Sequence, residues 1–323
     1  MAEAPIALTM GDPAGVGPEI TVLALSGGAI TFPVRVIGDR GRLEMALRQL
    51  ASGGRARSFE LDSIDLVDLA NVPSSVAWGH LAAEAGRACF EYVERAAQLA
   101  LSGEVAAICT APINKEAWRA AGVPHPGHTE ALAALCKTDR FAMMLVNQRL
   151  RVVHLSTHSS LVEAVARATT DRCLECLQLA AAFLRDQAGV SNPRLAVAGI
   201  NPHAGENGLL GTEDREHLLP AITRARGLGI DASGPWSPDT VFARGATGEF
   251  DCVIAAYHDQ GHIPIKMLGL DTGVNVTIGL PIIRTSVDHG TAFDIAGRGV
   301  VREANLLTAL NLAHELAMVR SWL

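Results

Sequence analysis

Residues 252–262, CVIAAYHDQGH, decide the fold class of this 323-residue chain. An apolar run with the length of a buried strand is followed at once by a polar cluster that contains a glycine. Apolar runs of this kind indicate strands that are covered on both faces, as in a parallel sheet. Similar successions of an apolar run and a polar cluster lead into GDPAGVGPE (residues 11–19), APINKE (111–116), THSS (157–160) and PHAGENG (202–208), the first and last of which contain glycine.

Eight apolar runs predict strands, and longer helical patterns lie between them. The runs are PIALTM (5–10), VRVIGD (34–39), VAAICTA (105–111), AMMLVNQ (142–148), RVVHLST (151–157), RLAVAGIN (194–201), CVIAAYH (252–258) and VNVTIGL (274–280). The helical patterns cover residues 82–101, 161–187, 213–226 and 303–319. This alternation predicts an α/β fold with largely parallel sheets. Ligands bind at the carboxyl ends of strands in such sheets, so we expect the five polar clusters to converge on one cleft.

Length and composition indicate a compact soluble protein with two domains. Hydrophobic residues make up 49% and charged residues 19%, and the formal net charge is -7. No run is rich in lysine and arginine, so we expect no nucleic-acid partner. No apolar stretch is long enough to cross a membrane, and residues 1–15 do not resemble a signal peptide, so we expect a cytoplasmic protein. The six cysteines are interpreted as reduced thiols, although Cys173 and Cys176 form a C-x-x-C within a helical pattern.

Three histidines occupy strand ends: His158, His203 and His258. Three imidazoles with an open coordination position suit a catalytic divalent ion, whereas a single histidine is more often a structural hydrogen-bonding group. Asp239 and Asp259 are candidates for orienting the imidazoles or accepting a proton. Capping of a helix or turn is the alternative for both aspartates.

A cationic and polar set predicts an anion site, namely His128, Thr129, Lys266, Asn275 and Arg284. Lysine and arginine in apolar segments need a partner, because an unpaired buried charge is costly. A phosphate or carboxylate of a ligand is one such partner, and a protein carboxylate is the alternative. Lys115 also follows a strand, and its role is either catalytic or structural.

No predicted strand is followed by G-x-G-x-x-G, so a nicotinamide cofactor would need a binding mode other than the Rossmann fingerprint. Residues 289–299, HGTAFDIAGRG, form a loop of small residues. Backbone in such a loop can approach a flat ligand closely.

Taken together, these residues resemble the 4-hydroxythreonine-4-phosphate dehydrogenase family. The resemblance extends from residue 10 to about residue 300. The segments GDPAGVGPEI and HGTAFDIAG are also similar, more distantly, to isocitrate and isopropylmalate dehydrogenases. The blocks that carry the family resemblance are MGDPAGVGPEI, TAPINKEA, GHTE, THSSL, INPHAGENG, GPWSPDTVF, YHDQGHIPIK and VNVTIGLPIIRTSVDHGTAFDIAG.

The resemblance implies a two-domain α/β/α subunit of the isocitrate/isopropylmalate dehydrogenase-like type, with the active site in the cleft between the domains. Residues 1–127 and 289–323 would form the first, cofactor-side domain. Residues 128–288 would form the second, with metal, substrate and dimer contacts. The family further implies NAD or NADP, one divalent ion per site (Zn, Mg, Co or Mn), and a homodimer that shares its active sites.

The resemblance also implies a role for each candidate residue. The metal ligands would be His158, His203 and His258, donated by both subunits. The catalytic group would comprise Asp239, Asp259 and Lys115. The substrate would be bound by His128, Thr129, Lys266, Asn275 and Arg284. The cofactor would lie against His289, Gly290, Thr291, Ala292, Asp294 and Gly297.

The implied reaction oxidises a phosphorylated hydroxy acid to a 3-keto acid, which then loses carbon dioxide. With 4-phosphohydroxy-L-threonine the product would be 3-amino-2-oxopropyl phosphate. One departure leaves the substrate open, because His262 stands where family members of the vitamin B6 pathway carry an apolar residue. Branches acting on D-threonate or D-erythronate 4-phosphate, or on a dihydrodiol dicarboxylate, are the alternatives. A metal-dependent lyase or phosphatase, or a solute-binding protein, would be a rival interpretation.

Overall fold

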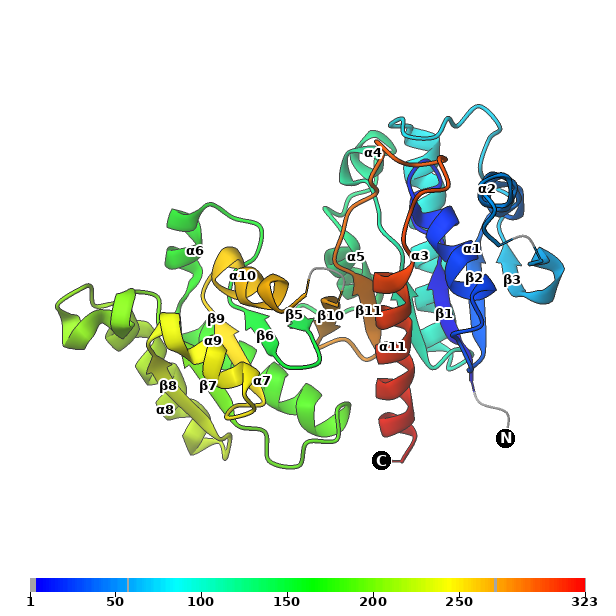
Figure 1. Ribbon diagram of the computed structural model, residues 1–323. Coiled ribbons are helices and arrows are strands. Elements are labelled where there is room, and N and C mark those ends of the chain that lie inside the picture. Colours follow the sequence, from blue (N-terminus) through cyan, green and yellow to red (C-terminus); the bar gives the residue numbers. More distant parts are fainter. Residues whose placement is uncertain (1–3, 57, 270–271, 323) are drawn as a thin grey trace. The chain divides into compact units, whose positions relative to one another are not determined.

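The computed structural model describes residues 4–56, 58–269 and 272–322. The chain divides into two compact units. The first unit comprises Met1–Asp139 and Leu280–Ala317, and the second comprises Arg140–Gly279 and Met318–Leu323. In Figure 1 the first unit runs from blue to teal and again in red, and the second from green to orange.

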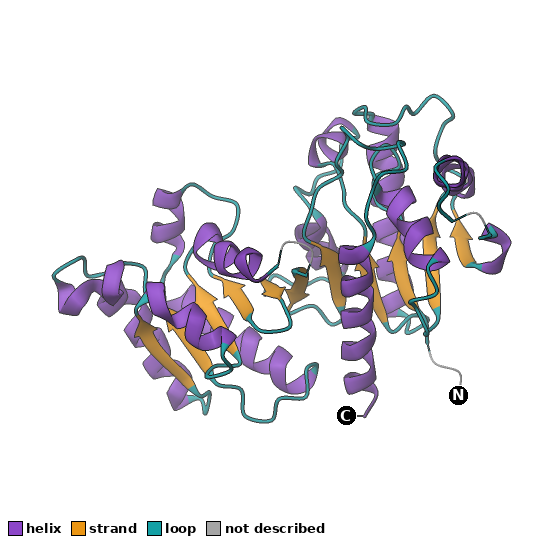
Figure 2. Ribbon diagram, in the orientation of Figure 1, coloured by secondary structure: helices purple, strands orange, loops and turns teal. Residues whose placement is uncertain are grey.

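The first unit is built on a parallel sheet. Its elements in chain order are β1 (Ile6–Thr9), α1 (Gly17–Ser26), β2 (Val34–Gly38), α2 (Arg40–Ser52), β3 (Asp65–Asp68), α3 (Ala83–Leu101), β4 (Ala107–Thr110), α4 (Lys115–Ala120), α5 (His128–Leu135), β11 (Arg284–Val287) and α11 (Ala304–Trp322), the last of which ends in the second unit. The strand order is β3-β2-β1-β4-β11. Figure 2 shows helices on both sides of these strands.

The second unit is a mixed sheet with helices on both sides (Figure 2). Its elements are β5 (Ala142–Val146), β6 (Arg151–His154), α6 (Leu161–Arg167), α7 (Thr170–Asp186), β7 (Leu195–Ala198), α8 (Leu219–Gly227), β8 (Ala232–Trp236), α9 (Pro238–Ala246), β9 (Cys252–Ala255), α10 (His258–Leu268) and β10 (Val274–Ile278). The strand order is β10-β5-β6-β9-β7-β8. Only β5 runs antiparallel to its neighbours among the described strand pairs of this unit.

The units differ from the expected domains at all three crossings of the chain, and residues 318–323, which we expected in the first domain, belong to the second unit. Residues 128–139 and 280–288, which we expected in the second domain, belong to the first unit. The physical reason is pairing and packing, because β11 pairs with β4 and α5 packs on α3. The predicted substrate residues are therefore divided between the units.

The predicted polar clusters form two groups, one at the strand ends of each unit. In the second unit β6, β9 and β7 are parallel neighbours, so the segments after them leave from the same edge of the sheet. In the first unit β1, β4 and β11 are likewise parallel neighbours. Residues 11–16, 111–114 and 288–303 follow these three strands.

All eight predicted strands are confirmed, and the fold is α/β. The predicted helix 161–187 is divided into α6 and α7, because the side chain of Thr169 accepts a hydrogen bond from Arg172 N and begins a new helix. The pattern over 213–226 begins with the π-helical turn Asp214–Leu218, and α8 starts next to Pro220. Proline cannot donate to the preceding turn, so a regular α-helix does not continue through it.

Two further expectations concern the cysteines and the membrane. All six cysteines are free, and all but Cys136 are buried. Burial raises the pKa of the Cys173 and Cys176 thiols on α7, so neither is a reactive thiolate. Among the residues that the structure describes, no helix is both long enough and apolar enough to cross a membrane.

Candidate active site

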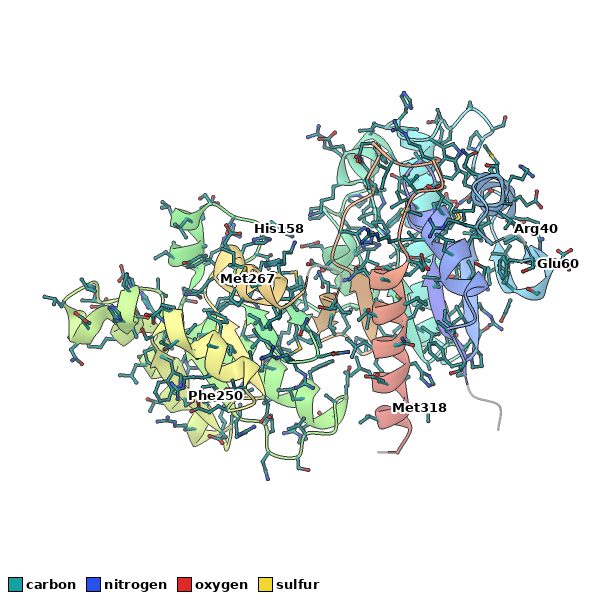
Figure 3. All side chains as sticks on the ribbon, in the orientation of Figure 1. Arg40, Glu60, His158, Phe250, Met267 and Met318 are labelled. Atoms are coloured by element: carbon teal, nitrogen blue, oxygen red, sulfur yellow. The ribbon has the colours of Figure 1, made fainter. Side chains whose placement is uncertain are left out.

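The three predicted metal ligands lie in the second unit, each beyond the carboxyl end of a strand. His158 follows β6, His203 follows β7, and His258 is the first residue of α10. The ring centroids of His158 and His258 are 5.9 Å apart, and Figure 3 labels His158. Within the described part of one chain, no three histidine, cysteine, aspartate or glutamate side chains are placed to hold a metal ion. A single chain therefore brings two predicted ligands near each other without completing the set.

The ring of His258 is held by two neighbouring side chains. Its Nδ1 lies 2.6 Å from Oδ1 of Asp259, which leaves Nε2 available for a ligand. The ring also stacks on His262, with centroids 3.6 Å apart and an interplanar angle of 12°. Both contacts restrict rotation of the imidazole, so its orientation is largely set before any ligand binds.

A fourth histidine, which the sequence analysis did not single out, lies behind His262. His154 at the end of β6 is 1% exposed, and its ring centroid is 4.8 Å from that of His262. Burial, together with the nearby imidazoles of His262 and His258, lowers the pKa of His154 to about 3. Neither ring nitrogen makes a hydrogen bond of normal geometry to the described residues. A Cβ at Gly261 would collide with this ring, so the glycine is required for α10 to pack here.

His203 sits in a left-handed turn. The five residues from His203 to Asn207 all have positive φ, with values of 52, 54, 81, 42 and 58°. This conformation costs roughly 1–2 kcal/mol for each non-glycine residue, so surrounding contacts must impose it. Oγ of Ser237 lies 3.4 Å from His203 Nδ1 and donates to Oδ1 of Asp239 at 2.5 Å. Asp239 is therefore connected to the His203 ring through Ser237.

A second group of predicted residues gathers in the first unit around Arg284. This arginine lies on β11, is 2% exposed, and donates from Nη2 to Thr110 Oγ1 at 2.8 Å. Burial lowers its pKa to about 10, so it stays charged at neutral pH. His128 is the first residue of α5, and its pKa is held well below its usual value by burial and by the charges of Arg284 and Lys115. The buried Nε2 of His128 has no hydrogen-bond partner among the described residues.

The remaining candidates of the anion site differ in exposure. Lys115 is the exposed first residue of α4, and its Cε would be 3.5 Å from a Cβ at Gly127, next to His128. Thr129 is half-buried in the first turn of α5. Lys266 on α10 is exposed, so the expectation that it lies in a buried apolar segment is wrong. The sequence IPIK reads as apolar, but in a helix its lysine falls on the outer face.

Asn275, the last predicted substrate residue, lies on β10 of the second unit. It pairs in register with Leu145 of the antiparallel strand β5. Its Oδ1 is buried and has no hydrogen-bond partner within the described residues. A buried amide oxygen of this kind is available to a ligand donor, because leaving it unsatisfied is costly.

The predicted cofactor loop is bound tightly to the first polar cluster. The buried carboxylate of Glu19 accepts hydrogen bonds from Gly297 N at 2.8 Å and Gly299 N at 2.7 Å. Val16 N donates to the carbonyl of Thr291 at 3.0 Å. A Cβ at Gly290 would meet nothing within 4 Å, so the backbone there is open to a ligand. Of the other predicted cofactor contacts, His289 and Asp294 are exposed, and Ala292 has a φ of 43°.

Three residues that hold parts of the site in place were not predicted from the sequence. They are Glu19, which binds the predicted cofactor loop, His154, which packs behind His262, and Asp214, which accepts hydrogen bonds from the backbone before His203. The partners of Glu19 are 278 and 280 positions away, and no local pattern signals such a contact. A histidine inside an apolar strand run was the available signal for His154. An aspartate eleven residues after His203 resembles any helix-capping residue.

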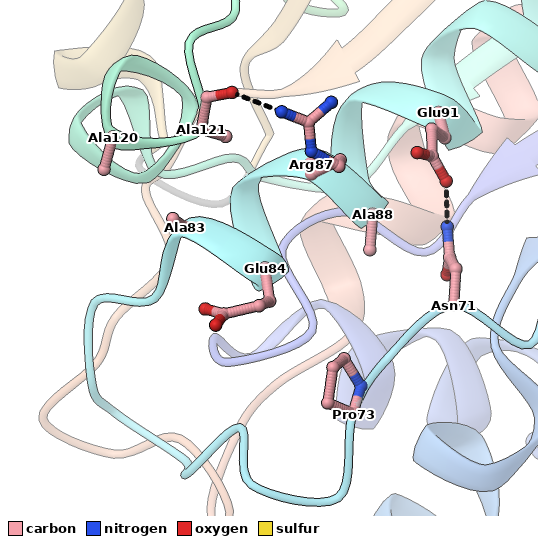
Figure 4. Close-up of a pocket in the computed structure, with 9 residues that line it drawn as sticks. All are labelled: Asn71, Pro73, Ala83, Glu84, Arg87, Ala88, Glu91, Ala120 and Ala121. Atoms are coloured by element: carbon pink, nitrogen blue, oxygen red, sulfur yellow. Dashed lines mark hydrogen bonds between the residues drawn. The ribbon is translucent and has the colours of Figure 1, made fainter.

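The first unit contains a pocket of about 410 Å³, which Figure 4 shows. None of the predicted site residues lines it. Its arginine, Arg87, donates to the carbonyl of Ala121 at 2.8 Å, and Glu91 accepts from Asn71 at 2.7 Å. Arg87 and Glu91 are thus engaged with protein, and we assign the pocket no ligand.

Comparisons with known proteins show what the chain as a whole is similar to. The family model of the "Pyridoxal phosphate biosynthetic protein PdxA" matches residues 31–313. A D-threonate 4-phosphate dehydrogenase from Cupriavidus necator is 47% identical over 98% of each chain. A 4-hydroxythreonine-4-phosphate dehydrogenase from Trichlorobacter lovleyi is 43% identical over 98% of each chain. The crystal structure of a 4-hydroxythreonine-4-phosphate dehydrogenase from Klebsiella pneumoniae, 44% identical, superimposes with a TM-score of 0.88 over 98% of this chain and 100% of that one.

Proposed function

The chain belongs to the pyridoxal phosphate biosynthetic protein PdxA family, and we propose that it oxidises a 4-phosphorylated 3-hydroxy acid with NAD or NADP and one divalent metal ion per site. It is an oxidoreductase, as its family and its relatives are. In the proposed reaction the 3-keto acid then loses carbon dioxide. We place the enzyme in the cytoplasm, where free cysteines stay reduced.

The first candidate substrate is D-threonate 4-phosphate. Relatives with that activity in their names reach 47% identity over nearly the whole chain, and proteins named for 4-hydroxythreonine-4-phosphate reach 46%. The second candidate is therefore 4-phosphohydroxy-L-threonine. Both compounds carry the 4-phosphate and the 3-hydroxy acid that the reaction needs.

The observation that carries the proposal is the group of donors around Arg284. A buried guanidinium, the unsatisfied Nε2 of His128 and the first turn of α5 occur together in the first unit. A helix N-terminus and a charged arginine both favour a phosphate. In the proposed enzyme Thr129, Lys266 and Asn275 add further contacts to the substrate.

The proposed metal site is formed by His158, His203 and His258 from two chains. Three imidazoles suit Zn²⁺ or another divalent transition ion, and the Asp259 contact leaves Nε2 of His258 as the donor atom. The set is incomplete within the described part of one chain, which supports a homodimer with shared sites. Six apolar side chains that are more than half exposed in the second unit support an interface there: Leu161, Val162, Leu209, Leu228, Ile263 and Met267.

The proposed chemistry assigns each group a task. When bound, the divalent ion stabilises the negative charge on the substrate hydroxyl oxygen, and the oxidised nicotinamide accepts the hydride. Arg284 and His128 fix the phosphate, which places the hydroxyl-bearing carbon for reaction. Asp259 and Asp239 orient the two histidine rings that they contact directly or through Ser237. Lys115, beside His128, exchanges a proton with the substrate.

The cofactor site that we propose is the loop 289–297. Its backbone is held in place by Glu19 and is open at Gly290. A rigid loop with open backbone suits the adenosine half of NAD or NADP, because little conformational freedom is lost on binding. His289, Thr291, Ala292, Asp294 and Gly297 would complete this surface.

Comparing the candidate substrates tests the proposal. Purified enzyme with Co²⁺ or Zn²⁺ is given D-threonate 4-phosphate, D-erythronate 4-phosphate or 4-phosphohydroxy-L-threonine, each with NAD and with NADP. We expect reduced nicotinamide and carbon dioxide in equal amounts, with the highest kcat/KM for D-threonate 4-phosphate. Preference for a non-phosphorylated dihydrodiol dicarboxylate would overturn the substrate class.

A further inference from the structure

The left-handed turn that carries His203 needs an outside support. Four of its five residues are not glycine, and the ring of His203 itself is exposed. Local sequence preference does not favour this backbone, because only Gly205 adopts it without a steric penalty and Asn207 tolerates it. Contacts from elsewhere in the chain must therefore hold it.

The side chain that supplies these contacts is Asp214. It is 2% exposed and lies at the start of the π-helical turn Asp214–Leu218. Its Oδ1 accepts from Ile200 N at 2.6 Å, and its Oδ2 accepts from Asn201 N at 3.1 Å and Asn201 Nδ2 at 2.9 Å. Both carboxylate oxygens are thus bonded to the two residues that lead into the turn.

The turn also packs directly against this carboxylate. A Cβ built on Gly199 would lie 3.1 Å from Asp214 Oδ1, and one on Gly205 would lie 3.4 Å from Oδ2. Gly199 precedes the turn and Gly205 is at its centre. Asp214 therefore contacts the segment on both sides of His203, and both of its oxygens are engaged in these contacts.

We infer that Asp214 is a positioning residue that fixes the left-handed turn and thereby presents the ring of His203. This inference rests on the proposed function, in which His203 is a metal ligand. Its action differs from that of Ser237 and Asp239, which contact the imidazole ring. Asp214 acts on the backbone instead.

The experiment compares Asp214→Asn with a matched control. Asparagine has nearly the same shape but directs an N–H₂ group at backbone donors, so at least one hydrogen bond is lost. The control is Asp251→Asn, which removes a carboxylate that accepts from Arg194 N at 2.8 Å at the opposite end of β9 from His258. Metal-free protein of each variant is titrated with Co²⁺, and amide hydrogen exchange is measured over residues 199–211.

We expect Asp214→Asn to weaken Co²⁺ affinity by about 10–100-fold, as loss of a supporting contact typically does. Exchange should become faster over residues 199–211 and stay unchanged in β5 and β6. Asp251→Asn should bind Co²⁺ like the wild type. Wild-type Co²⁺ affinity and wild-type exchange in Asp214→Asn would overturn the inference.

If the proposed function is wrong, the Co²⁺ titrations give a different result. If wild-type protein and His203→Ala bind Co²⁺ equally, His203 is not a ligand, and both the proposal and the inference fall. If only His203→Ala loses affinity, the proposed site stands and the inference alone is overturned. Should Asp214→Asn not fold, Asn201→Ala decides, because it removes one of the three hydrogen bonds and keeps the carboxylate. Faster exchange and weaker Co²⁺ binding in that variant support the inference, and wild-type behaviour overturns it.

Discussion

Arg284 and His154 are both almost fully buried, yet burial leaves them in opposite charge states at neutral pH. The pKa of Arg284 falls to about 10, so the guanidinium keeps its charge and can bind an anion. The pKa of His154 falls to about 3, so the imidazole is neutral and serves as packing beneath α10. Substrate binding therefore tests the role of Arg284, and the stability of the fold tests the role of His154.

Replacing Arg284 by glutamine should weaken binding of the phosphorylated substrate about 10–100-fold, because a charge-assisted contact contributes about 1.5–3 kcal/mol. The KM for D-threonate 4-phosphate should rise by that factor, while the inhibition constant of unphosphorylated D-threonate stays within about twofold of the wild type. Arg87→Gln is the control, since Arg87 also donates to protein but lines a different pocket. Equal losses with both compounds would mean that Arg284 serves only the fold.

Replacing His154 by leucine should make the protein less sensitive to acid. A histidine has a pKa of about 6.5 when unfolded and about 3 here, so the unfolded chain binds the proton first as pH falls. Its neutral packing therefore stabilises the fold above pH 6.5, and that stability is lost between about pH 6.5 and 3. The loss is on the order of 5 kcal/mol.

Urea unfolding between pH 3 and 8 measures this effect. His154→Leu should lose less stability than the wild type in that window. His80→Leu, at an exposed histidine, should keep it. An identical pH dependence in wild type and His154→Leu would refute the assigned cause.

Among the helices and strands, those that are determined by local sequence patterns were predicted best. Runs such as LAVA of β7 are apolar throughout, and all eight strands of this kind were found. The missed strands are β3, β8 and β11, with the sequences DLVD, ASGPW and RTSV, which are polar or contain glycine and proline. They are strands because their neighbours pair with them. α10 was missed because HDQGHIPIKML contains Gly261 and Pro264.

Residues of the candidate site were likewise predicted only where a local sequence pattern marks them. Histidines at strand ends are visible in the sequence, because a strand and its following polar cluster are adjacent. Glu19 and Asp214 are not, since their importance lies in bonds to backbone groups that only the folded chain brings near. The burial of Arg284 was predicted correctly. Lys266 was expected to be buried but is exposed, because helical facing could not be assigned to IPIK.

Glu19 links α1 to the proposed cofactor loop, and Glu19→Gln should loosen that loop. The amide cannot accept from both Gly297 N and Gly299 N as the carboxylate does. We expect the KM for NAD or NADP to rise about 10-fold, with a smaller change in the KM for the substrate. Asp68→Asn is the control, because Asp68 also accepts from two backbone amides in the first unit, those of Arg40 and Ala70. If Glu19→Gln changes both KM values alike, the loop does not bind the cofactor.

At the scale of the whole molecule, the proposed site requires two chains. Single variants His158→Ala, His203→Ala and His258→Ala should each be inactive, and they can be mixed in pairs after verified subunit exchange. A pair whose ligands come from different chains regains about a quarter of wild-type activity at random exchange, because half of the dimers are mixed and one of their two sites is intact. At least one pair should recover in this way. No recovery in any pair would contradict shared sites.

The central claim is that this enzyme couples nicotinamide reduction to a phosphorylated hydroxy acid and a divalent ion. The most direct measurement follows reduced nicotinamide after metal-stripped protein receives NAD or NADP, D-threonate 4-phosphate and then Co²⁺. We expect no signal before Co²⁺ is added, a steady rate afterwards with one carbon dioxide per nicotinamide reduced, and no rate with unphosphorylated D-threonate. Release of inorganic phosphate without nicotinamide reduction, for this compound and for 4-phosphohydroxy-L-threonine alike, would contradict it.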